Sequence, residues 1–311
     1  MFQANGTSIT VFIFLGFSHY PKVEVIIFIL CLLMYLFTLL GNIILISITI
    51  LDSYLHTPMY FFLSNLSFLD IWYTSFALTP MLANFLSGRS TISFTGCASQ
   101  MYFSLALGST EGVLLSMMAY DRYVAICYPL RYPIIMNRSV CVQIAVGSWV
   151  TGCLTALVET VAVLQLSFCG NSIINHFTCE ILAILNLACV DTSMVQLIML
   201  VISVLLLPMP MLLICISYTF ILFSIQKSHS VDGQSKAFST CAAHLSVVVL
   251  FYGTALSMYL KPLEVNSQEI DKFMALVYSG LTPMLNPIIY SLRNKKVKLA
   301  VKKFLFKKSF W

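Results

Sequence analysis

The sequence predicts an all-α membrane protein, a bundle of seven transmembrane helices with the N-terminus outside. Of its 311 residues, 59% are hydrophobic and only 9% are charged, whereas about a quarter of the residues of a soluble domain are charged. A helix needs about 20 mostly apolar residues to cross the hydrocarbon core of a bilayer. Stretches of this kind occupy residues 25–51, 57–86, 97–127, 139–163, 193–225, 237–260 and 273–292.

The distribution of Lys and Arg predicts the orientation, because the cytoplasmic loops of membrane proteins collect positive charge. Of the 17 Lys and Arg residues, 13 fall in one set of loops, and the other set holds only Lys22, Arg89, Lys261 and Lys272. The larger set includes every cation after the last apolar stretch, so we expect the C-terminus inside. The net charge of +5 then reflects topology, and no nucleic-acid partner is expected.

The chain is expected to form one domain with two short appendages. Residues 1–24 are an extracellular N-terminus, residues 25–292 the transmembrane bundle, and residues 293–311 a cytoplasmic amphipathic helix and tail. The last segment carries an apolar stripe at helical spacing between lysines, formed by Val297, Ala300, Val301, Phe304 and Leu305. Such a stripe is typical of a helix on the inner membrane surface; a solvated basic tail is the alternative.

Cysteines and glycosylation sequons agree with this orientation. Four of the ten cysteines fall outside, in the oxidising compartment: Cys97, Cys169, Cys179 and Cys189. Four cysteines allow three pairings, and all three stay open. Of the three Asn-x-Ser/Thr sequons, only the one at Asn5 lies where glycosylation takes place.

Asp70 lies within the second stretch and Glu111 within the third. An ionised group inside a membrane helix costs about 2.5–3.5 kcal/mol on insertion scales, so both are functional candidates. The two carboxylates would repel each other unless they bind a cation, most simply Na⁺, or one of them is protonated. A polar network with Asn42 and Asn286 that only holds helices together is an equally open alternative.

Signals for catalysis are weak. The sequence has no obvious metal-ligand spacing, glycine-rich phosphate loop or nucleophile elbow, so an enzyme is not expected. Prolines at 58, 80, 208, 210, 283 and 287 are expected to start, kink or hinge the helices. Transporters also use such breaks, so the prolines alone do not separate a receptor from a carrier.

Motifs along nearly the whole chain carry a family resemblance. They are GN at 41–42, LHTPMYFFLSNLSFLD at 55–70, MAYDRYVAIC at 118–127, SY at 217–218, KAFSTCAAHL at 236–245, FYGT at 251–254 and PMLNPIIYSLRN at 283–294. In this order and spacing, the chain resembles a rhodopsin-like (class A) G-protein-coupled receptor. It resembles more closely a vertebrate olfactory receptor of the tetrapod-type class II.

The resemblance implies specific bonds and a cation site. The disulfides would be Cys97–Cys179, between helix 3 and the second outer loop, and Cys169–Cys189 within that loop. Asp70 and Glu111 would line the family's internal sodium site.

The resemblance also implies a cytoplasmic switch. It assigns this role to Asp121, Arg122, Tyr123, Tyr218, Asn286, Pro287 and Tyr290. We expect Asp121 to restrain Arg122 at rest, and Arg122 to pair with Tyr218 or the G protein in the active state. Ala243 stands where the family usually has serine, and Lys296 where it usually has aspartate, so those two contacts are not carried over.

The family's pattern places a ligand pocket in the outer half of the bundle. At about 1.5 Å per residue, Ser104 lies roughly 27 Å along helix 3 from Arg122. The expected lining residues are Ser104, Leu105, Gly108, Ser109, Ile202, Ser203, Leu206, Tyr252, Ala255, Leu256, Tyr259 and Ser279. They are mostly apolar with a few hydroxyls, as in many small-molecule sites. Helix packing is the alternative role of the smallest residues.

The resemblance implies an odorant receptor in the plasma membrane, in the cilia of olfactory sensory neurons. A neutral volatile ligand is expected, because receptors for biogenic amines carry an acid where Ser104 stands. The ligand would shift helix 6, with Tyr252 as the movable aromatic beneath the pocket, and an olfactory stimulatory G protein would raise cAMP. The alternatives are a related chemoreceptor for a metabolite outside the olfactory epithelium and a seven-helix transporter.

Overall fold

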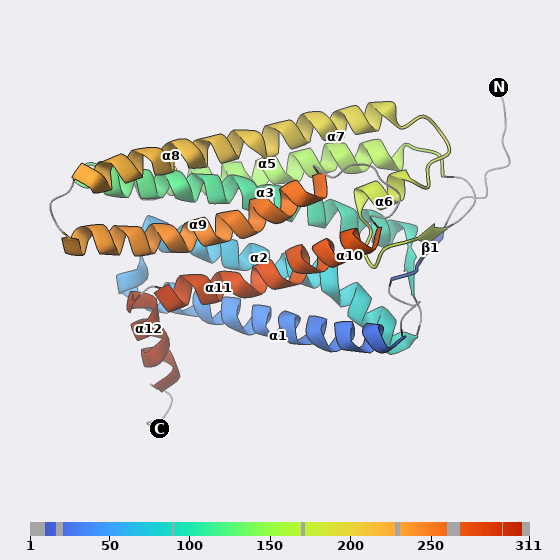
Figure 1. Cartoon of the computed structure of the whole chain (residues 1–311), viewed down its shortest axis with the longest axis horizontal. Helices are drawn as coiled ribbons and strands as arrows, with labels where there is room; N and C mark the ends of the chain where they lie inside the picture. The colour runs from blue at the N-terminus through green and yellow to red at the C-terminus, as the bar shows by residue number, and fades with distance from the viewer. Residues whose placement is uncertain are drawn as a thin grey trace.

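The computed structural model describes residues 10–16, 21–88, 90–168, 172–227, 231–259, 268–293 and 295–306. Long helices run side by side and form an elongated bundle (Figure 1). They are α1 (Pro21–Leu51), α2 (Pro58–Ser87), α3 (Phe94–Cys127), α5 (Arg138–Leu164), α7 (Ser193–Leu206), α8 (Pro208–Lys227), α9 (Val231–Tyr259), α10 (Gln268–Leu276) and α11 (Thr282–Arg293).

Shorter elements connect the long helices and close the two ends of the bundle. The helical ones are η1 (Ser53–Leu55), α4 (Tyr132–Ile135), α6 (Ile181–Leu185), the π-helical turn η2 (Val277–Leu281) and α12 (Lys295–Phe306). The strands are β1 (Val11–Phe14), β2 (Thr91–Ser93) and β3 (Ile173–Ile174). The strands lie at one end, and α12 projects from the other (Figure 1).

Local sequence signals explain several helix starts. Pro58 is the first residue of α2, where its missing N–H would have no partner in any case. Ser93 caps α3 and Asn137 caps α5. Their side-chain oxygens accept hydrogen bonds from the N–H groups of Gly96 and Val140, both at 3.1 Å.

Five of the seven predicted stretches correspond to single helices, with ends that differ by at most six residues. The other two are interrupted. Residues 193–225 divide into α7 and α8 at Leu207, because Pro208 lacks an N–H and its ring clashes with the preceding turn. Residues 273–292 contain the π-helical turn between α10 and α11.

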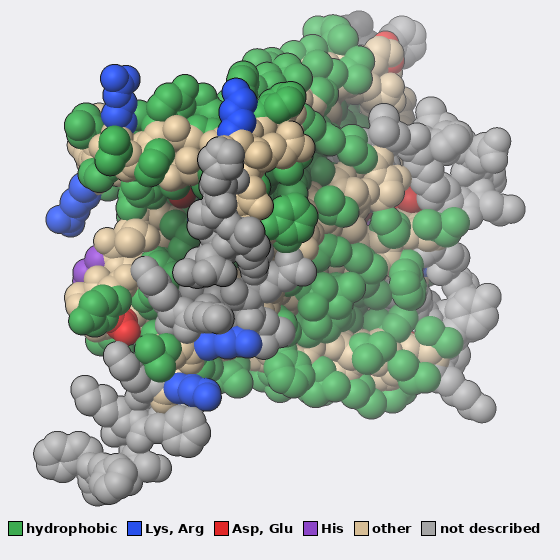
Figure 2. Space-filling view, turned by 60° about the vertical axis from the view of Figure 1, so that its left-hand side comes forward, with side chains coloured by type: hydrophobic (Ala, Val, Ile, Leu, Met, Phe, Trp, Pro, Cys, Tyr) green, Lys and Arg blue, Asp and Glu red, His purple; other side chains and the backbone are tan. Residues whose placement is uncertain are grey.

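The surface of the described residues suits an apolar solvent. Side chains such as Leu36, Leu200 and Phe223 are more than half exposed, and hydrophobic side chains cover much of the face in Figure 2. Within the described residues, four helical runs are long and apolar enough to cross a membrane, namely Val23–Leu51, Arg138–Leu164, Ser193–Lys227 and Ile270–Tyr290. The total number of crossings and their orientation stay predictions.

Exposed cations gather at the end from which α12 projects (Figure 2). The exposed Lys and Arg side chains in the described part of the chain are Arg131, Arg138, Lys227, Lys298 and Lys302. The helix predicted after residue 293 is present as α12. Val297 and Ala300 of its apolar stripe are buried against the bundle.

The small sheet at the opposite end was not predicted. β1 lies between β2 and β3, antiparallel to β2 and parallel to β3. Phe12 and Phe14 turn inward and join a buried cluster with Met101 and Ile174. The segment VFIF is apolar throughout, so it lacks the alternation that marks a strand in a sequence.

α3 is the central helix of the bundle and contacts α2, α5, α8 and α9. Its closest approach is to α5, at Gly152. A Cβ atom on Gly152 would collide with the Thr110 hydroxyl and lie 2.5 Å from the carbonyl oxygen of Ala106. Because a backbone carbonyl cannot move aside, only glycine allows this contact.

Gly152→Ala is therefore expected to separate α3 from α5 and to destabilise the fold by about 1–3 kcal/mol, the usual range for overpacking. Thermal unfolding of the detergent-purified chain and its surface level in cells measure this. Gly147→Ala is the matched control, because a Cβ at Gly147 on the same helix meets no atom within 4 Å. Equal unfolding temperatures for the two variants would contradict the argument.

Candidate ligand pocket, ion site and cytoplasmic switch

A cavity of about 170 Å³ lies in the half of the bundle nearest the strands. The structure brings nine of the twelve predicted ligand residues together around it: Ser104, Leu105, Gly108, Ser109, Ile202, Ser203, Leu206, Ala255 and Ser279. They come from α3, α7, α9 and η2. Their role in binding a ligand stays a prediction.

The three remaining predicted residues are all on α9. Tyr252 is buried beneath the cavity, and its hydroxyl donates a hydrogen bond to the Gly112 carbonyl at 3.0 Å. Gly112 itself lines the cavity floor. Leu256 is half-buried and does not line the cavity, and the side chain of Tyr259 lies outside the described part of the chain.

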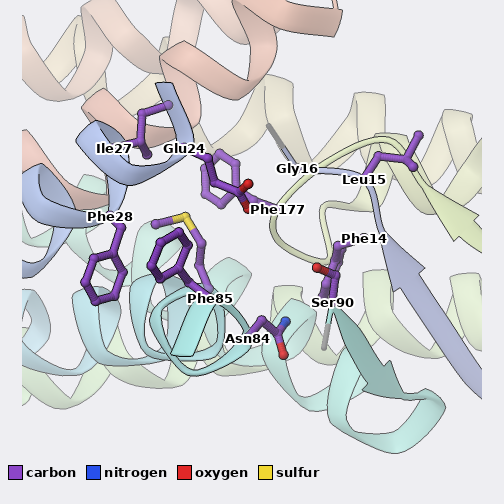
Figure 3. A pocket seen from close by; sticks show the side chains of 11 residues that line it. Phe14, Leu15, Gly16, Glu24, Ile27, Phe28, Asn84, Phe85, Ser90 and Phe177 are labelled. Atoms are coloured by element: carbon purple, nitrogen blue, oxygen red, sulfur yellow. The ribbon is translucent and has the colours of Figure 1, made fainter. Parts of the chain in front are cut away.

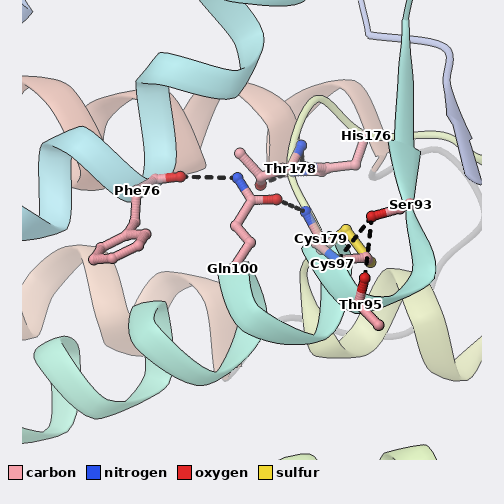
Figure 4. Close-up of a disulfide and its surroundings, with 9 residues drawn as sticks. Phe76, Ser93, Thr95, Cys97, Gln100, His176, Thr178 and Cys179 are labelled. Atoms are coloured by element: carbon pink, nitrogen blue, oxygen red, sulfur yellow. Dashed lines mark hydrogen bonds between the residues drawn. A yellow bond between two sulfur atoms is a disulfide. The ribbon is translucent and has the colours of Figure 1, made fainter.

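The second outer loop forms the roof of the cavity. Cys97 at the start of α3 is bonded to Cys179, with a Cα–Cα distance of 5.4 Å, which confirms the first predicted disulfide. One turn further along α3, Gln100 accepts the N–H of Cys179 and donates to the carbonyl of Phe76, both at 3.0 Å (Figure 4). The loop is thereby fixed across α3 and α2, and Thr178 faces the cavity.

Two predicted features fall on residues that the structure leaves out. Cys189 is disulfide-bonded, but its predicted partner Cys169 lies outside the described residues. The glycosylation site at Asn5 lies outside them as well. Both stay predictions.

Sequence reasoning missed several lining residues, above all Glu159 of α5 and Glu180 of the outer loop. Like Asp70 and Glu111, Glu159 is an acid inside an apolar stretch. The insertion cost that singled out those two acids applies to Glu159 as well. Glu180 follows the disulfide-bonded Cys179 directly. Its position over the cavity follows from the Cys97–Cys179 bridge.

A second cavity lies between β1, α1 and α2 at the same end, with Glu24 and Phe177 among its lining residues (Figure 3). Its volume is about 40 Å³, which is room for a water or two. This space is too small for an odorant-sized molecule.

The outer end of the bundle is held together by a buried polar cluster. Lys272 at the start of α10 is fully buried and donates to the carbonyl of Gly16 at 2.8 Å. The N–H of Gly16 in turn donates to the carbonyl of His176 at 3.2 Å. These bonds join the N-terminal segment, the outer loop and α10.

The His176 ring sits in this cluster in its neutral form. Its Nδ1 accepts the N–H of Thr178 at 3.1 Å, so Nε2 carries the proton, and Nε2 lies 3.6 Å from Oε2 of Glu180. Burial, together with the nearby charge of Lys272, lowers the pKa of His176 to about 4, although Asp271 acts in the opposite direction. Burial and the charge of Asp271 raise the pKa of Glu180 to about 8.

The predicted ion site brings Asp70, Glu111 and Asn286 together in the middle of the bundle. All three are almost completely buried, and the Asn286 side-chain amide donates to both oxygens of Asp70 at 3.1 Å. Within the described residues, two buried side-chain oxygens of this group, Glu111 Oε1 and Asn286 Oδ1, have no hydrogen-bond partner. Unpaired oxygens next to two carboxylates fit a hard cation such as Na⁺.

The predicted switch residues divide into separate groups. Arg122 is buried, and it lies close enough to Tyr218, Tyr290 and His244 for its guanidinium charge to interact with their side chains. Pro287 packs against Gly41 of α1. Tyr123 contacts the rings of Tyr128 and Phe220 instead.

The hydroxyl of Tyr132 on α4 donates a hydrogen bond to Oδ1 of Asp121 at 2.8 Å. Among the described residues, Asp121 and Arg122 form no ion pair within 4.0 Å. The restraint of Arg122 by Asp121 thus stays a prediction for the resting state. Tyr132 was not predicted, because nothing in the sequence of α4 indicates its reach to α3.

His244 of α9 is a further residue to which the sequence assigned no role of its own. Its Nε2 donates to the Leu115 carbonyl of α3 at 3.1 Å, because a carbonyl can only accept. In the neutral ring, Nδ1 then accepts the hydroxyl of Tyr218 at 2.7 Å. His244 therefore links α9 to both α3 and α8.

Comparison with known proteins gives the class of molecule. Residues 30–308 match the olfactory receptor family. The chain is 80% identical to human olfactory receptor 13F1, over the whole chain and 97% of that receptor. It is 64% identical to human olfactory receptor 2K2, over 97% of the chain and 96% of that receptor.

An apolar helical bundle with this similarity is a class A G-protein-coupled receptor, a membrane protein that is not an enzyme. The chain belongs to the olfactory receptor family. Receptors of this family sense odorants and couple to G proteins.

Lowering the pH from 7 to 5 is expected to destabilise the outer end by about 2 kcal/mol through His176. Its pKa falls from 6.5 to about 4 on folding, so the unfolded state binds more protons between these values, and stability present above pH 6.5 is lost as the pH falls. Glu180, with its raised pKa, has the opposite sign, so the comparison must be made between variants. His176→Asn keeps an acceptor for Thr178 and does not titrate.

The unfolding temperature of the purified receptor between pH 7 and 5 is the measurement. The difference between wild type and His176→Asn isolates the histidine. Parallel curves for the two proteins would show that His176 does not titrate in this range.

Proposed function

We propose that the chain is an odorant receptor that crosses the membrane seven times and binds a small, neutral volatile molecule in the 170 Å³ cavity. Binding activates an olfactory stimulatory heterotrimeric G protein, which raises cAMP. The observation that supports this proposal is that nine of the predicted ligand residues line one cavity. Residues 1–24 are the extracellular N-terminus, 25–292 the receptor domain and 293–311 the cytoplasmic tail.

The proposed orientation rests on the chemistry of the two ends. The exposed described cations lie at the α12 end, as expected for the cytoplasmic side. The disulfide Cys97–Cys179 lies at the cavity end, as expected for the oxidising exterior. An odorant therefore enters from outside, and the G protein docks at the opposite end, around Arg122. The ciliary plasma membrane is the proposed location.

Two hydrogen bonds between α9 and α3 suggest how ligand binding changes the conformation at the cytoplasmic end. Tyr252 bonds to Gly112 just beneath the cavity, and His244 bonds to Leu115 about 12 Å further down α9. A ligand that contacts the cavity floor alters the first bond. Any movement of α9 must then alter the second, next to Arg122. The ligand shifts the equilibrium only by its difference in affinity between the two states.

The ion site is proposed as a modulator of this shift. Asp70 and Glu111, with Asn286 between them, would hold a sodium ion. Because Asp70 is on α2, Glu111 on α3 and Asn286 on α11, an ion there would hold three helices in one arrangement. The polar network without an ion is the alternative.

An odorant panel tested on cells that express the chain examines the function. We expect odorant-evoked cAMP from wild type, and its loss in Arg122→Ala at matched surface level. Arg138→Ala, an exposed cation at the same end, is the control and should signal normally. Full signalling by Arg122→Ala would refute the switch, and the absence of any response to a broad panel would count against the odorant function.

Tyr252→Leu is expected to raise the odorant EC50 about tenfold, because it removes a buried hydrogen bond worth about 1–1.5 kcal/mol together with the ring. Surface expression should change much less. Val249→Ala on the lipid-exposed side of the same helix is the matched control. An unchanged cAMP response at equal surface level would remove Tyr252 from the pathway.

A further inference from the structure

The cavity contains a buried carboxylate that the proposed function does not use. Glu159 of α5 lines the cavity and is only 5% exposed. In the described part of the chain it has no hydrogen bond, ion pair or other polar partner. A buried carboxyl group without a partner is unfavourable, so its presence at a cavity wall points to a partner that arrives from within the cavity.

The other lining residues supply very little to satisfy it. Among the described lining residues there is no Lys, Arg or His. A second carboxyl group, that of Glu180, lines the same space from the loop after Cys179. The other polar lining groups are hydroxyls, and Glu159 accepts a hydrogen bond from none of them in the described structure; they belong to Tyr73, Ser104, Ser109, Thr178, Ser203, Tyr278 and Ser279.

The rest of the wall is apolar and suits a hydrocarbon body. Met101 and Leu105 of α3, Ile202 and Leu206 of α7, and Phe251 of α9 line the same cavity. A fitting molecule is therefore an amphiphile with one polar end. That end must donate a hydrogen bond, because a ligand with only acceptors would leave Glu159 unpaired. An anionic ligand is disfavoured because the described lining offers no cation to pair with it.

We propose that Glu159 determines the specificity of this receptor by accepting a hydrogen bond from the ligand, which selects odorants with a hydroxyl or amine group and rejects carboxylic acids. This proposal rests on the proposed odorant function and on the same cavity. An alcohol needs only the acceptor oxygen. A protonated amine also needs the negative charge and would replace the neutral ligand proposed above, so the two ligand types can be told apart.

The test uses five compounds on one carbon skeleton: a primary alcohol, a primary amine, a ketone, a methyl ester and a carboxylic acid. For wild type, we expect EC50 values for the alcohol or the amine at least tenfold below those of the ketone and ester, and no response to the acid. Glu159→Leu should raise the EC50 of the donor compounds about tenfold or more and abolish this ranking. Thr160→Val is the control, because Thr160 is a buried neighbour that does not line the cavity.

Glu159→Gln separates the two ligand types. Glutamine keeps the acceptor oxygen and loses the charge, so an alcohol response should survive within a few-fold and an amine response should be lost. Because glutamine is nearly isosteric with glutamate, this variant also decides the question if Glu159→Leu fails to reach the surface. An unchanged ranking in Glu159→Leu at equal surface level, or a carboxylic acid as the best agonist, would overturn the proposal.

Thermal stabilisation of the purified receptor by the same compounds separates this inference from the proposed function. If donor compounds raise the unfolding temperature of wild type but not of Glu159→Leu, and no compound evokes cAMP, the signalling proposal fails and the specificity proposal stands. If cAMP responses occur without preference for donor compounds, the signalling proposal stands and the specificity proposal fails. If no compound does either, both are overturned.

Discussion

A helix bundle in lipid has no water with which to satisfy its buried polar groups, so each of them needs a partner within the protein. In this receptor α3 carries several of the partnerships between helices. Gln100 holds the outer loop and α2, the carbonyls of Gly112 and Leu115 hold α9, and Asp121 holds α4. The bundle is thereby organised around one helix that runs from the disulfide end to the opposite end, where α4 packs.

The same constraint explains where the functional groups sit. Among the described residues, Glu111 and Asn286 of the central ion site, and Arg122 and Tyr290, each carry a buried polar atom without a hydrogen-bond partner, and the unpaired carboxylate of Glu159 borders the cavity. A stable bundle would avoid such groups, because each is costly in an apolar solvent. Their positions coincide with the places where an odorant, an ion and a G protein are proposed to act.

Much of the bundle could be predicted because membrane helices are long and apolar. Length and hydropathy alone located the helices, and Pro208 accounts for the break between α7 and α8. The pocket residues followed from the family's motifs, since a helix fixes the spacing of Ser104, Gly108 and Ser109 once its register is known. The disulfide Cys97–Cys179 followed from the same resemblance.

The remaining features depend on contacts between segments far apart in the chain. The strand at Val11–Phe14 has no alternating pattern and gains its partners only from two distant loops. Tyr132 and His244 look like ordinary residues until α4 and α9 are placed against α3. Glu159 is a different case, because an acid within an apolar stretch is visible in the sequence and could have been predicted as a site residue.

The bond between Lys272 and Gly16 has a consequence for how the receptor is made. The two residues are 256 positions apart, so the N-terminal segment cannot reach its final place until α10 has been synthesised and inserted. The bond that ties this segment to α10 therefore forms only when nearly the whole chain has been translated. A chain that stalls before α10 lacks this bond and also lacks the cavity wall that Ala275, Tyr278 and Ser279 supply.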